Sequence, residues 1–221
     1  MDIQNLRSNY NLGSLKREDL KDDPFDQFLA WLDDAVKAAV IEPNAMALST
    51  VSKDGKPSSR MVLLKGLDGN GFRFFTNLQS RKSREIMETS FTSANVFWKE
   101  LQRQVIIEGV AEKMTREDSE AYFATRPRGS QLSVWASVQD QIISSRDVLE
   151  EAYKAAELRY HDQPVPMPAF WGGFRIIPDR FEFWQGRPDR LHDRFQYVPV
   201  SSDRFQYTLC TAGWQIDRLS P

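Results

Sequence analysis

The chain has 221 residues, of which 41% are hydrophobic and 27% are charged, and its formal net charge is −2 at pH 7. This balance argues against a general binder of nucleic acid or of anionic membrane surfaces, because such proteins need a net basic face. The single cysteine, Cys210, excludes an intrachain disulfide, and no stretch reaches the roughly 18 apolar residues of a membrane span, so we expect a cytoplasmic protein.

The polar residues 1–20 predict a mobile arm, which precedes one domain over residues 21–221. Asp23 is suited to cap a helix and Pro24 to begin it, and apolar residues at helical spacing predict an amphipathic helix over 24–40. Further helices are predicted over 80–89, 115–125 and 145–161. Segments rich in β-formers and separated by turn residues predict strands within 45–52, 58–67, 71–77, 92–100, 103–114, 172–186, 190–199 and 205–219.

The order of these elements predicts the fold class. The strands follow one another mostly through hairpin turns, and helices interrupt them at only a few places. This arrangement favours an antiparallel β-barrel with inserted helices, an α+β fold.

Two basic residues stand at the beginning of the helix predicted over 80–89. Ser80 is suited to cap this helix, and Arg81 and Lys82 fall in its first turn, where the helix dipole disfavours positive charge. A phosphate held by free backbone N–H groups and both cations would explain the arrangement. A solvated basic turn is the alternative.

A second polar set consists of Tyr122, Arg126 and Ser130, which would share one face of a continuous helix. Such a set suits a phosphate monoester, and although Pro127 interrupts the helix before Ser130, the loop could bring that residue back to the other two. A tyrosine packed under an arginine stem explains the spacing equally well. Arg60 and Lys65 flank an apolar strand and would face opposite sides of it, so solvated strand ends account for them too.

The segment Trp184–Phe195, WQGRPDRLHDRF, concentrates cationic side chains. In a strand that begins near Arg190, that residue, His192 and Arg194 would point to the same face. Three potential cations on one face repel one another unless an anionic or π-rich group covers them, so we interpret this face as the wall of a binding site, with Trp184 as an aromatic neighbour.

Several segments, taken in order over nearly the whole chain, resemble the pyridoxine/pyridoxamine 5′-phosphate oxidase family: RMVLLK, FFTNLQSRK, RQV, YFATRPRGSQ, EFWQG, RLHDR and IDRLSP. The resemblance implies an FMN-binding split barrel that works as a homodimer, with FMN at the subunit interface. It implies oxidation of pyridoxamine 5′-phosphate and pyridoxine 5′-phosphate to pyridoxal 5′-phosphate by O2, which yields H2O2, and ammonia from the amine.

The resemblance also implies the roles of individual residues. The positions that match the family's FMN site are Arg60, Met61, Val62, Leu63, Leu64, Lys65, Phe75, Thr76, Arg81, Lys82, Gln104, Gln139, Asp140, Trp184 and Arg194. The positions that match its substrate site are Arg7, Tyr10, Lys65, Tyr122, Arg126 and Ser130, with Arg190 and His192 as the catalytic pair beside the flavin. No metal is implied. The arm that carries Arg7 and Tyr10 would close over the substrate.

Two alternatives share this barrel: a phenazine-biosynthesis oxidase and a non-catalytic flavin- or haem-binding protein. The second phosphate set, with Lys65 and Arg126, favours the vitamin B6 enzyme over both. One position departs from the family, because Asp140 stands where a serine near the FMN phosphate is usual. We expect its carboxylate to turn outward or to pair with Arg81 or Lys82, so that Asp140→Ser changes FMN affinity by less than about threefold.

Overall fold

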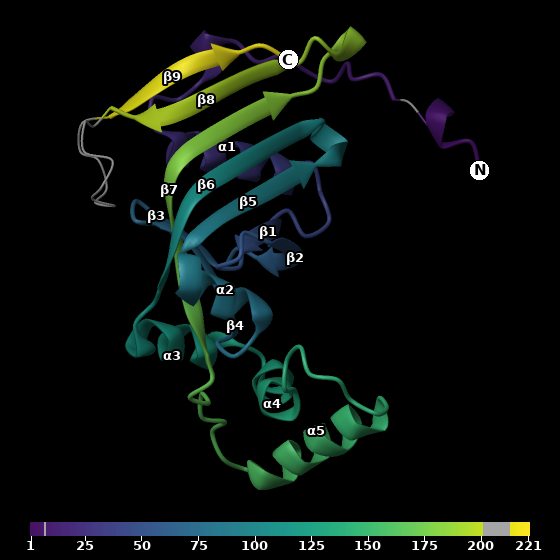
Figure 1. Cartoon of the computed structure of the whole chain (residues 1–221), viewed down its shortest axis with the longest axis vertical. Helices are drawn as coiled ribbons and strands as arrows, with labels where there is room; N and C mark the ends of the chain where they lie inside the picture. Colours follow the sequence, from purple (N-terminus) through teal and green to yellow (C-terminus); the bar gives the residue numbers. More distant parts are fainter. Residues whose placement is uncertain (7, 201–212) are drawn as a thin grey trace.

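The computed structural model describes residues 1–6, 8–200 and 213–221. Arg7 and the first part of the strand predicted over 205–219 therefore lie outside the described residues. Within them the chain forms one antiparallel sheet of nine strands, in the order β2-β1-β5-β6-β7-β4-β3, with β8 beside β7 and β9 beside β8 (Figure 1). The strands are β1 (Ala45–Val51), β2 (Pro57–Leu63), β3 (Gly66–Asp68), β4 (Gly71–Asn77), β5 (Phe91–Trp98), β6 (Arg103–Lys113), β7 (Trp171–Gln185), β8 (Asp193–Pro199) and β9 (Trp214–Leu219).

The long strand β7 divides the sheet. Its first part pairs with β4 and its second part with β8, while β6 runs beside both parts. The register of β6 and β7 shifts between Glu108 and Gly109, where Gly109 faces Pro178. Proline has no N–H for the ladder, and a Cβ on Gly109 would lie 2.1 Å from the Ile177 carbonyl oxygen, so glycine is required here. The predicted antiparallel β-barrel with inserted helices is confirmed.

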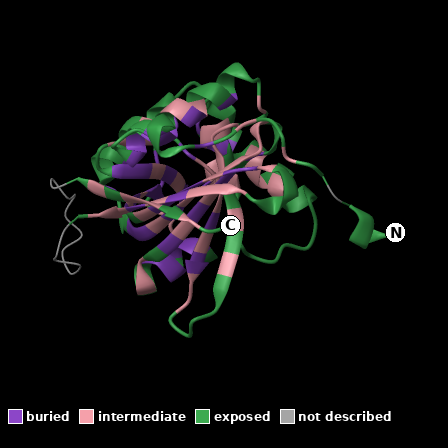
Figure 2. Ribbon diagram, turned by 90° about the horizontal axis from the view of Figure 1, so that it is seen from above, coloured by how far each residue is buried: buried purple, intermediate pink, exposed green. Residues whose placement is uncertain are grey.

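Helix α1 (Pro24–Lys37) covers the inner face of the sheet. Asp23 caps it by accepting a hydrogen bond from the Phe25 N–H at 2.7 Å. The helix buries Phe28 against Phe72 and Trp31 against Phe183, each pair in an edge-on ring contact. The buried residues in Figure 2 follow this layer between sheet and helix. Aromatic rings therefore make up much of the core, and phenylalanines at alternate positions of the strands supply several of them.

The remaining helices lie away from β8 and β9 in Figure 1, most of them at the other end of the molecule. They are α2 (Arg81–Thr89), α3 (Arg116–Thr125), α4 (Arg128–Ala136) and α5 (Asp147–Arg159). Short 3-10 turns occur at η1 (Ile3–Asn5), η2 (Arg17–Asp19), η3 (Lys99–Leu101) and η4 (Pro188–Arg190). Helix α4 was missed from the sequence, because Pro127 was interpreted as a break, whereas it precedes the first residue of a new helix. No helix in the described ranges is both long and apolar enough to span a membrane.

The N-terminal segment packs on the barrel in this structure. Leu15 and Leu20 belong to the main core, and the backbone N–H groups of Asn11 and Leu12 donate to the Gln102 side chain. The packed region thus begins before the predicted boundary at residue 20. The closing motion of the arm stays a prediction.

Candidate functional site

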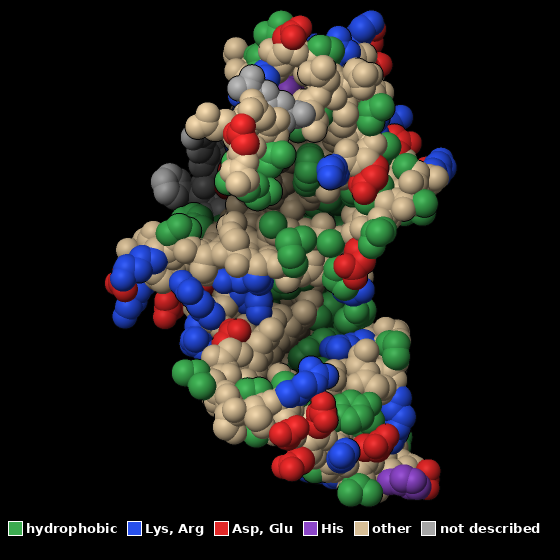
Figure 3. Space-filling model, turned by 90° about the vertical axis from the view of Figure 1, so that its right-hand side faces the viewer, with side chains coloured by type: hydrophobic (Ala, Val, Ile, Leu, Met, Phe, Trp, Pro, Cys, Tyr) green, Lys and Arg blue, Asp and Glu red, His purple; other side chains and the backbone are tan. Residues whose placement is uncertain are grey.

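A pocket of about 920 Å³ opens between the barrel and the helical end. Figure 3 shows a hollow in the molecule between its two ends, with lysine and arginine side chains gathered beside it. The strand β2, helix α2 and the α3–α4 connection all contribute to the pocket. Among the residues that line it are many of those predicted from the sequence: Arg60, Met61, Val62, Leu63, Lys65, Phe75, Thr76, Arg81, Lys82, Tyr122, Arg126, Ser130, Gln139 and Asp140.

The first turn of α2 carries a buried ammonium group. Lys82 is only 5% exposed, and its Nζ donates to Thr76 Oγ1 and Ser80 Oγ, each at 3.2 Å. Burial lowers the pKa of Lys82, because the charged form loses its water, while the charge of Asp140 acts in the opposite direction. A lysine held this way by neutral oxygen atoms is well placed to receive an anion.

Asp140 lies on the same helix terminus. Its carboxylate accepts a hydrogen bond from the backbone N–H of Arg81 at 2.6 Å, and its backbone adopts a positive φ of 68°. The neighbouring Gln139 accepts a hydrogen bond from Thr76 at 3.3 Å. The expected outward turn of Asp140 is therefore wrong, and so is an ion pair as its main contact: the carboxylate caps α2 from a distant loop.

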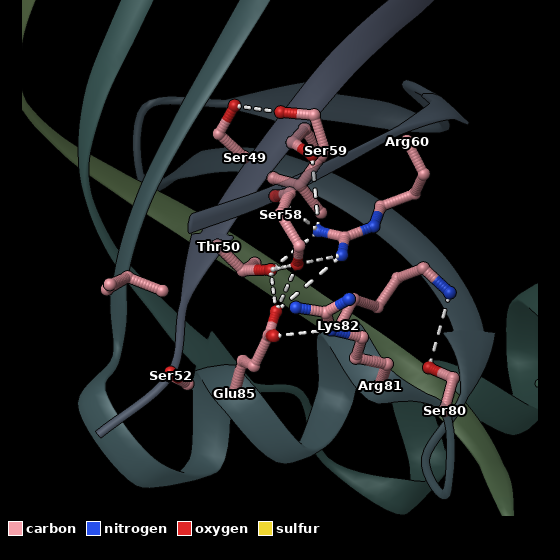
Figure 4. Close-up of polar contacts among 12 residues, drawn as sticks. Ser49, Thr50, Ser52, Ser58, Ser59, Arg60, Ser80, Arg81, Lys82 and Glu85 are labelled. Carbon is pink, nitrogen blue, oxygen red and sulfur yellow. Dashed lines mark hydrogen bonds and ion pairs between the residues drawn. The ribbon is translucent and has the colours of Figure 1, made fainter. Parts of the chain in front are cut away.

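Glu85 was not singled out from the sequence, although it stands one helical turn after Arg81. Its side chain is buried and accepts hydrogen bonds from Thr50, Ser58 and Arg81 (Figure 4). The spacing Arg81–Glu85 is the i,i+4 signal of a helical ion pair and would have revealed this contact.

The second phosphate-suited set also lines the pocket, and the turn at Pro127 rather than one continuous helix brings it together. Helix α3 ends at Thr125 because the next residue, Arg126, precedes a proline and is extended, with φ −71° and ψ 145°. Ser130 lies on the separate helix α4, so Tyr122, Arg126 and Ser130 do not share one helix face. The turn between the helices brings them together instead, and Arg126 donates to the Ser130 carbonyl at 2.9 Å.

Aromatic rings support these polar groups. The ring of Tyr122 stacks on Phe75 with centroids 3.9 Å apart, and the guanidinium of Arg126 lies 4.8 Å from the centroid of Trp171. Burial lowers the pKa of Arg126 and raises that of the Tyr122 hydroxyl. An arginine that is half withdrawn from water and stacked on an indole is preorganised for a charge-assisted bond.

A second cluster of predicted residues lies on the outer face of the sheet. Cross-strand register places Gln104 beside Trp184 and Trp184 beside Arg194. The ring centroids of His192 and Trp184 lie 4.7 Å apart. The ring of Tyr10 packs against both, with its centroid 5.5 Å from that of Trp184 and 5.7 Å from that of His192. Trp171 at the start of β7 lines the pocket, whereas Trp184 lies thirteen residues further along the same extended strand, so this cluster is remote from the pocket within one chain.

The predicted strand around Arg190 is wrong. Residues Pro188–Arg190 form a 3-10 turn, Asp189 and Arg190 have positive φ values of 55° and 63°, and β8 begins only at Asp193. The proline begins the turn, and the Arg187 N–H closes it by donating to Nδ1 of His192 at 3.1 Å. Arg190, His192 and Arg194 therefore do not form one row on a strand.

The expected repulsion between cations on this face is also relieved, by acids of the chain itself. Arg194 donates to both oxygens of the buried Glu182, at 2.8 and 3.0 Å, and Arg180 donates to the same carboxylate at 3.1 Å.

One residue predicted for the FMN site, Leu64, lies in the core and is not among the pocket residues.

Comparison with known proteins places the chain in a family. Residues 32–160 match the family model "Pyridoxamine 5′-phosphate oxidase", and residues 171–221 match "Pyridoxine 5′-phosphate oxidase C-terminal dimerisation region". The pyridoxine/pyridoxamine 5′-phosphate oxidase of Paraburkholderia phytofirmans is 49% identical over 219 residues, with 99% of each chain covered. That of Crocosphaera subtropica is 47% identical over 221 residues, with both chains covered completely.

Two solved structures share the fold. PhzG from Burkholderia lata 383, in complex with tetrahydrophenazine-1-carboxylic acid, superposes with a TM-score of 0.85 at 29% identity, covering 95% of this chain and 99% of PhzG. An FMN-binding protein from Nostoc punctiforme superposes with a TM-score of 0.70 at 14% identity, covering 90% of this chain and 98% of that protein. This match shows likeness of fold alone. From the two family matches and the full-length relatives, the chain belongs to the pyridoxamine 5′-phosphate oxidase family and is an oxidoreductase with FMN as its cofactor.

Proposed function

We propose that this chain is a cytoplasmic oxidase that converts pyridoxamine 5′-phosphate and pyridoxine 5′-phosphate to pyridoxal 5′-phosphate. The observation that carries the proposal is the presence of two phosphate-suited groups in one pocket. Arg60, Arg81 and Lys82 form the first, and the residues of the α3–α4 turn, with Lys65, form the second. A flavin mononucleotide and a phosphorylated substrate together bring two phosphates, one for each group.

The donor set around α2 fits the phosphate of FMN. The fit rests on the buried Lys82, whose hydrogen bonds in this structure go only to neutral hydroxyl groups among the described residues, and on the N-terminus of α2, where the Asp140 carboxylate binds the Arg81 N–H in this structure. Thr76 and Gln139 line the same region and would bind the polar side chain of the cofactor. When bound, FMN supplies the acceptor for a hydride and passes both electrons to O2.

The substrate's phosphate would be held by Lys65, Tyr122, Arg126 and Ser130. These contacts fix a ring whose 4′ carbon must face the flavin, and orientation of this kind lowers the barrier without a protein nucleophile. The alcohol and O2 give the aldehyde and H2O2. The amine, O2 and water give the aldehyde, ammonia and H2O2.

A second copy of the chain would complete the site. Trp184, His192 and Arg194 lie in the segment that matches a dimerisation region, and they are remote from the pocket of their own chain. The same outer face exposes Met61 and Phe97, which are 64% and 50% accessible. We propose that a homodimer covers this face, so that Arg190 and His192 of the partner subunit reach the substrate and Arg194 and Trp184 of the partner subunit reach FMN.

An anaerobic titration tests the function. Pyridoxine 5′-phosphate added to the yellow protein without O2 should bleach the flavin, and admitting O2 should restore the colour with one H2O2 per aldehyde. Pyridoxine without its phosphate is the control and should act only at far higher concentration. A phenazine-type oxidase, the alternative that the likeness to PhzG favours, would not be bleached by the phosphorylated vitamers, and neither would a non-catalytic flavin carrier.

A further inference from the structure

Glu85 holds a buried carboxylate between β1, β2 and α2, and it is only 4% exposed. Thr50 and Ser58, which face each other across β1 and β2, donate to its Oε2 at 2.5 and 2.6 Å. The Nε of Arg81 donates to Oε1 at 2.8 Å, and a terminal nitrogen of Arg60 lies 3.6 Å from Oε2. Figure 4 shows these side chains converging on the carboxylate.

The same two hydroxyl groups also bind Arg60. Its guanidinium donates to Thr50 Oγ1 at 2.6 Å, to the Ser58 hydroxyl and to the Leu48 carbonyl at 3.3 Å. Thr50 and Ser58 thus each accept from Arg60 and donate to Glu85. Such a relay has one direction only, because a carboxylate cannot donate and a guanidinium cannot accept.

The carboxylate is ionised at any ordinary pH. Burial by itself would raise the pKa of Glu85, but the hydrogen bonds from Ser58, Thr50 and Arg81, with the charge of Arg81, outweigh burial and lower the pKa to about 2. A buried carboxylate is weak evidence for a role in stability, because well-packed apolar residues usually serve as well. Its two basic partners, however, both line the pocket.

We propose that Glu85 is a positioning residue that holds the guanidinium groups of Arg60 and Arg81 in a fixed relative orientation for the phosphate of the cofactor. The inference rests on the proposed function, in which these arginines bind the FMN phosphate. Glu85 itself is buried and is not among the residues that line the pocket. Its own negative charge would, without the positioning effect, weaken phosphate binding. Positioning and simple charge therefore predict opposite results when the charge is removed.

The test measures what the phosphate contributes to flavin binding. The full-length chain, freed of flavin, is titrated with FMN and with riboflavin, and the ratio of the riboflavin Kd to the FMN Kd is compared in wild type and Glu85→Gln. We expect the substitution to lower this ratio about tenfold and to leave the riboflavin Kd unchanged. Glu88→Gln, on an exposed position of the same helix, is the matched control and should leave both constants unchanged.

Each other outcome has one meaning. A higher ratio in Glu85→Gln would show that the carboxylate acts by charge alone, and an equal loss of both ligands with a lower Tm would show a purely structural role, so either overturns the inference. A wild-type ratio near one would instead refute the phosphate site of the proposed function. If Glu85→Gln does not fold, Ser58→Ala keeps the charge and breaks one relay, and it should lower the ratio about threefold; an unchanged ratio there overturns the inference as well.

Discussion

The carboxylate of Asp140 lies 2.6 Å from the backbone nitrogen of Arg81, so an anion of the chain itself occupies the N-terminus of α2. The charge of this carboxylate also acts on Arg60 and Lys82, where it opposes the lowering of their pKa by burial. A phosphate bound at the same helix terminus would compete with it for the Arg81 N–H and be repelled by it.

The first prediction follows from this contact and replaces the expectation of a negligible effect. At about 5 Å and an effective dielectric near 20, the repulsion would be roughly 3 kcal/mol per unit charge, and nearby cations offset part of it. Asp140→Ser should therefore tighten FMN binding about tenfold or more in a titration of flavin-free protein. Asp162→Ser, at an exposed aspartate that also has positive φ, is the control. A change below threefold would mean that the loop moves away when the cofactor binds.

Replacement of Arg126 should affect the binding of the substrate's phosphate but not the binding of the FMN phosphate. Arg126→Ala loses a charge-assisted contact of about 1.5–3 kcal/mol, so the KM for pyridoxine 5′-phosphate should rise about 10-fold or more, with FMN affinity unchanged. Steady-state kinetics with flavin occupancy measured in parallel decide it. Arg146→Ala, at an exposed arginine, should have no effect. Loss of flavin with the KM intact would assign Arg126 to the cofactor.

Substitutions of Arg190 and Arg194 should have different effects, although the two residues are only four positions apart. Arg190→Met should lower kcat/KM while flavin stays bound. Arg194→Met should weaken flavin retention and also stability, because Glu182 loses two of its hydrogen bonds. Since Arg180 remains as its partner, we expect a loss of about 2 kcal/mol, below the figure for breaking a fully buried pair. Urea unfolding and flavin release measure both effects, and equal flavin loss in the two variants would contradict the division.

His192 should make stability depend on pH. Burial, and then the charges of Arg190 and Arg194, lower the pKa of His192 below its usual 6.5. A histidine whose pKa is lowered by folding binds fewer protons in the folded chain than in the unfolded chain. The free energy of unfolding should therefore fall as the pH drops below about 6.5, and it should level off below the pKa of the folded state. His192→Asn keeps an acceptor for the Arg187 N–H and should flatten this slope in unfolding curves between pH 5 and 7.5. An unchanged slope would assign the effect to another group.

Asp193 should hold the N-terminal arm in place. It accepts hydrogen bonds from the Leu15 N–H at 3.0 Å and from Arg218 at 2.7 Å. Asp193→Asn should weaken both contacts, so trypsin should cut after Arg17 several-fold faster, and the substrate KM should rise while FMN is retained. Asp189→Asn, which keeps a residue suited to positive φ, is the control. Unaltered proteolysis would show that the Gln102 contacts are sufficient to hold the arm.

Much of the fold is local information and could be predicted from the sequence. The alternation that buries Phe72 and Phe74 on one side of β4 has the period of a strand, and Asp23 with Pro24 begins α1 through its own backbone geometry. These patterns act between residues close in the chain, so they predicted the barrel and most of its helices. The motifs that resemble the oxidase family likewise identified residues that the structure brings into one pocket.

The tertiary structure decided what depends on contacts between distant residues. Asp140 reaches a helix terminus 59 residues away, and Glu85 binds a hydroxyl 35 residues away, so no local pattern gives their partners. The prediction of a strand at Arg190 was wrong because Pro188 begins a turn, and the side chain of His192 stabilises this turn by accepting a hydrogen bond from the Arg187 N–H. The separation of Trp184 from the pocket follows from the length of β7, which begins at the pocket with Trp171 and pairs with β4, β6 and β8 in turn, so only the pairing of distant strands fixes where its far end lies.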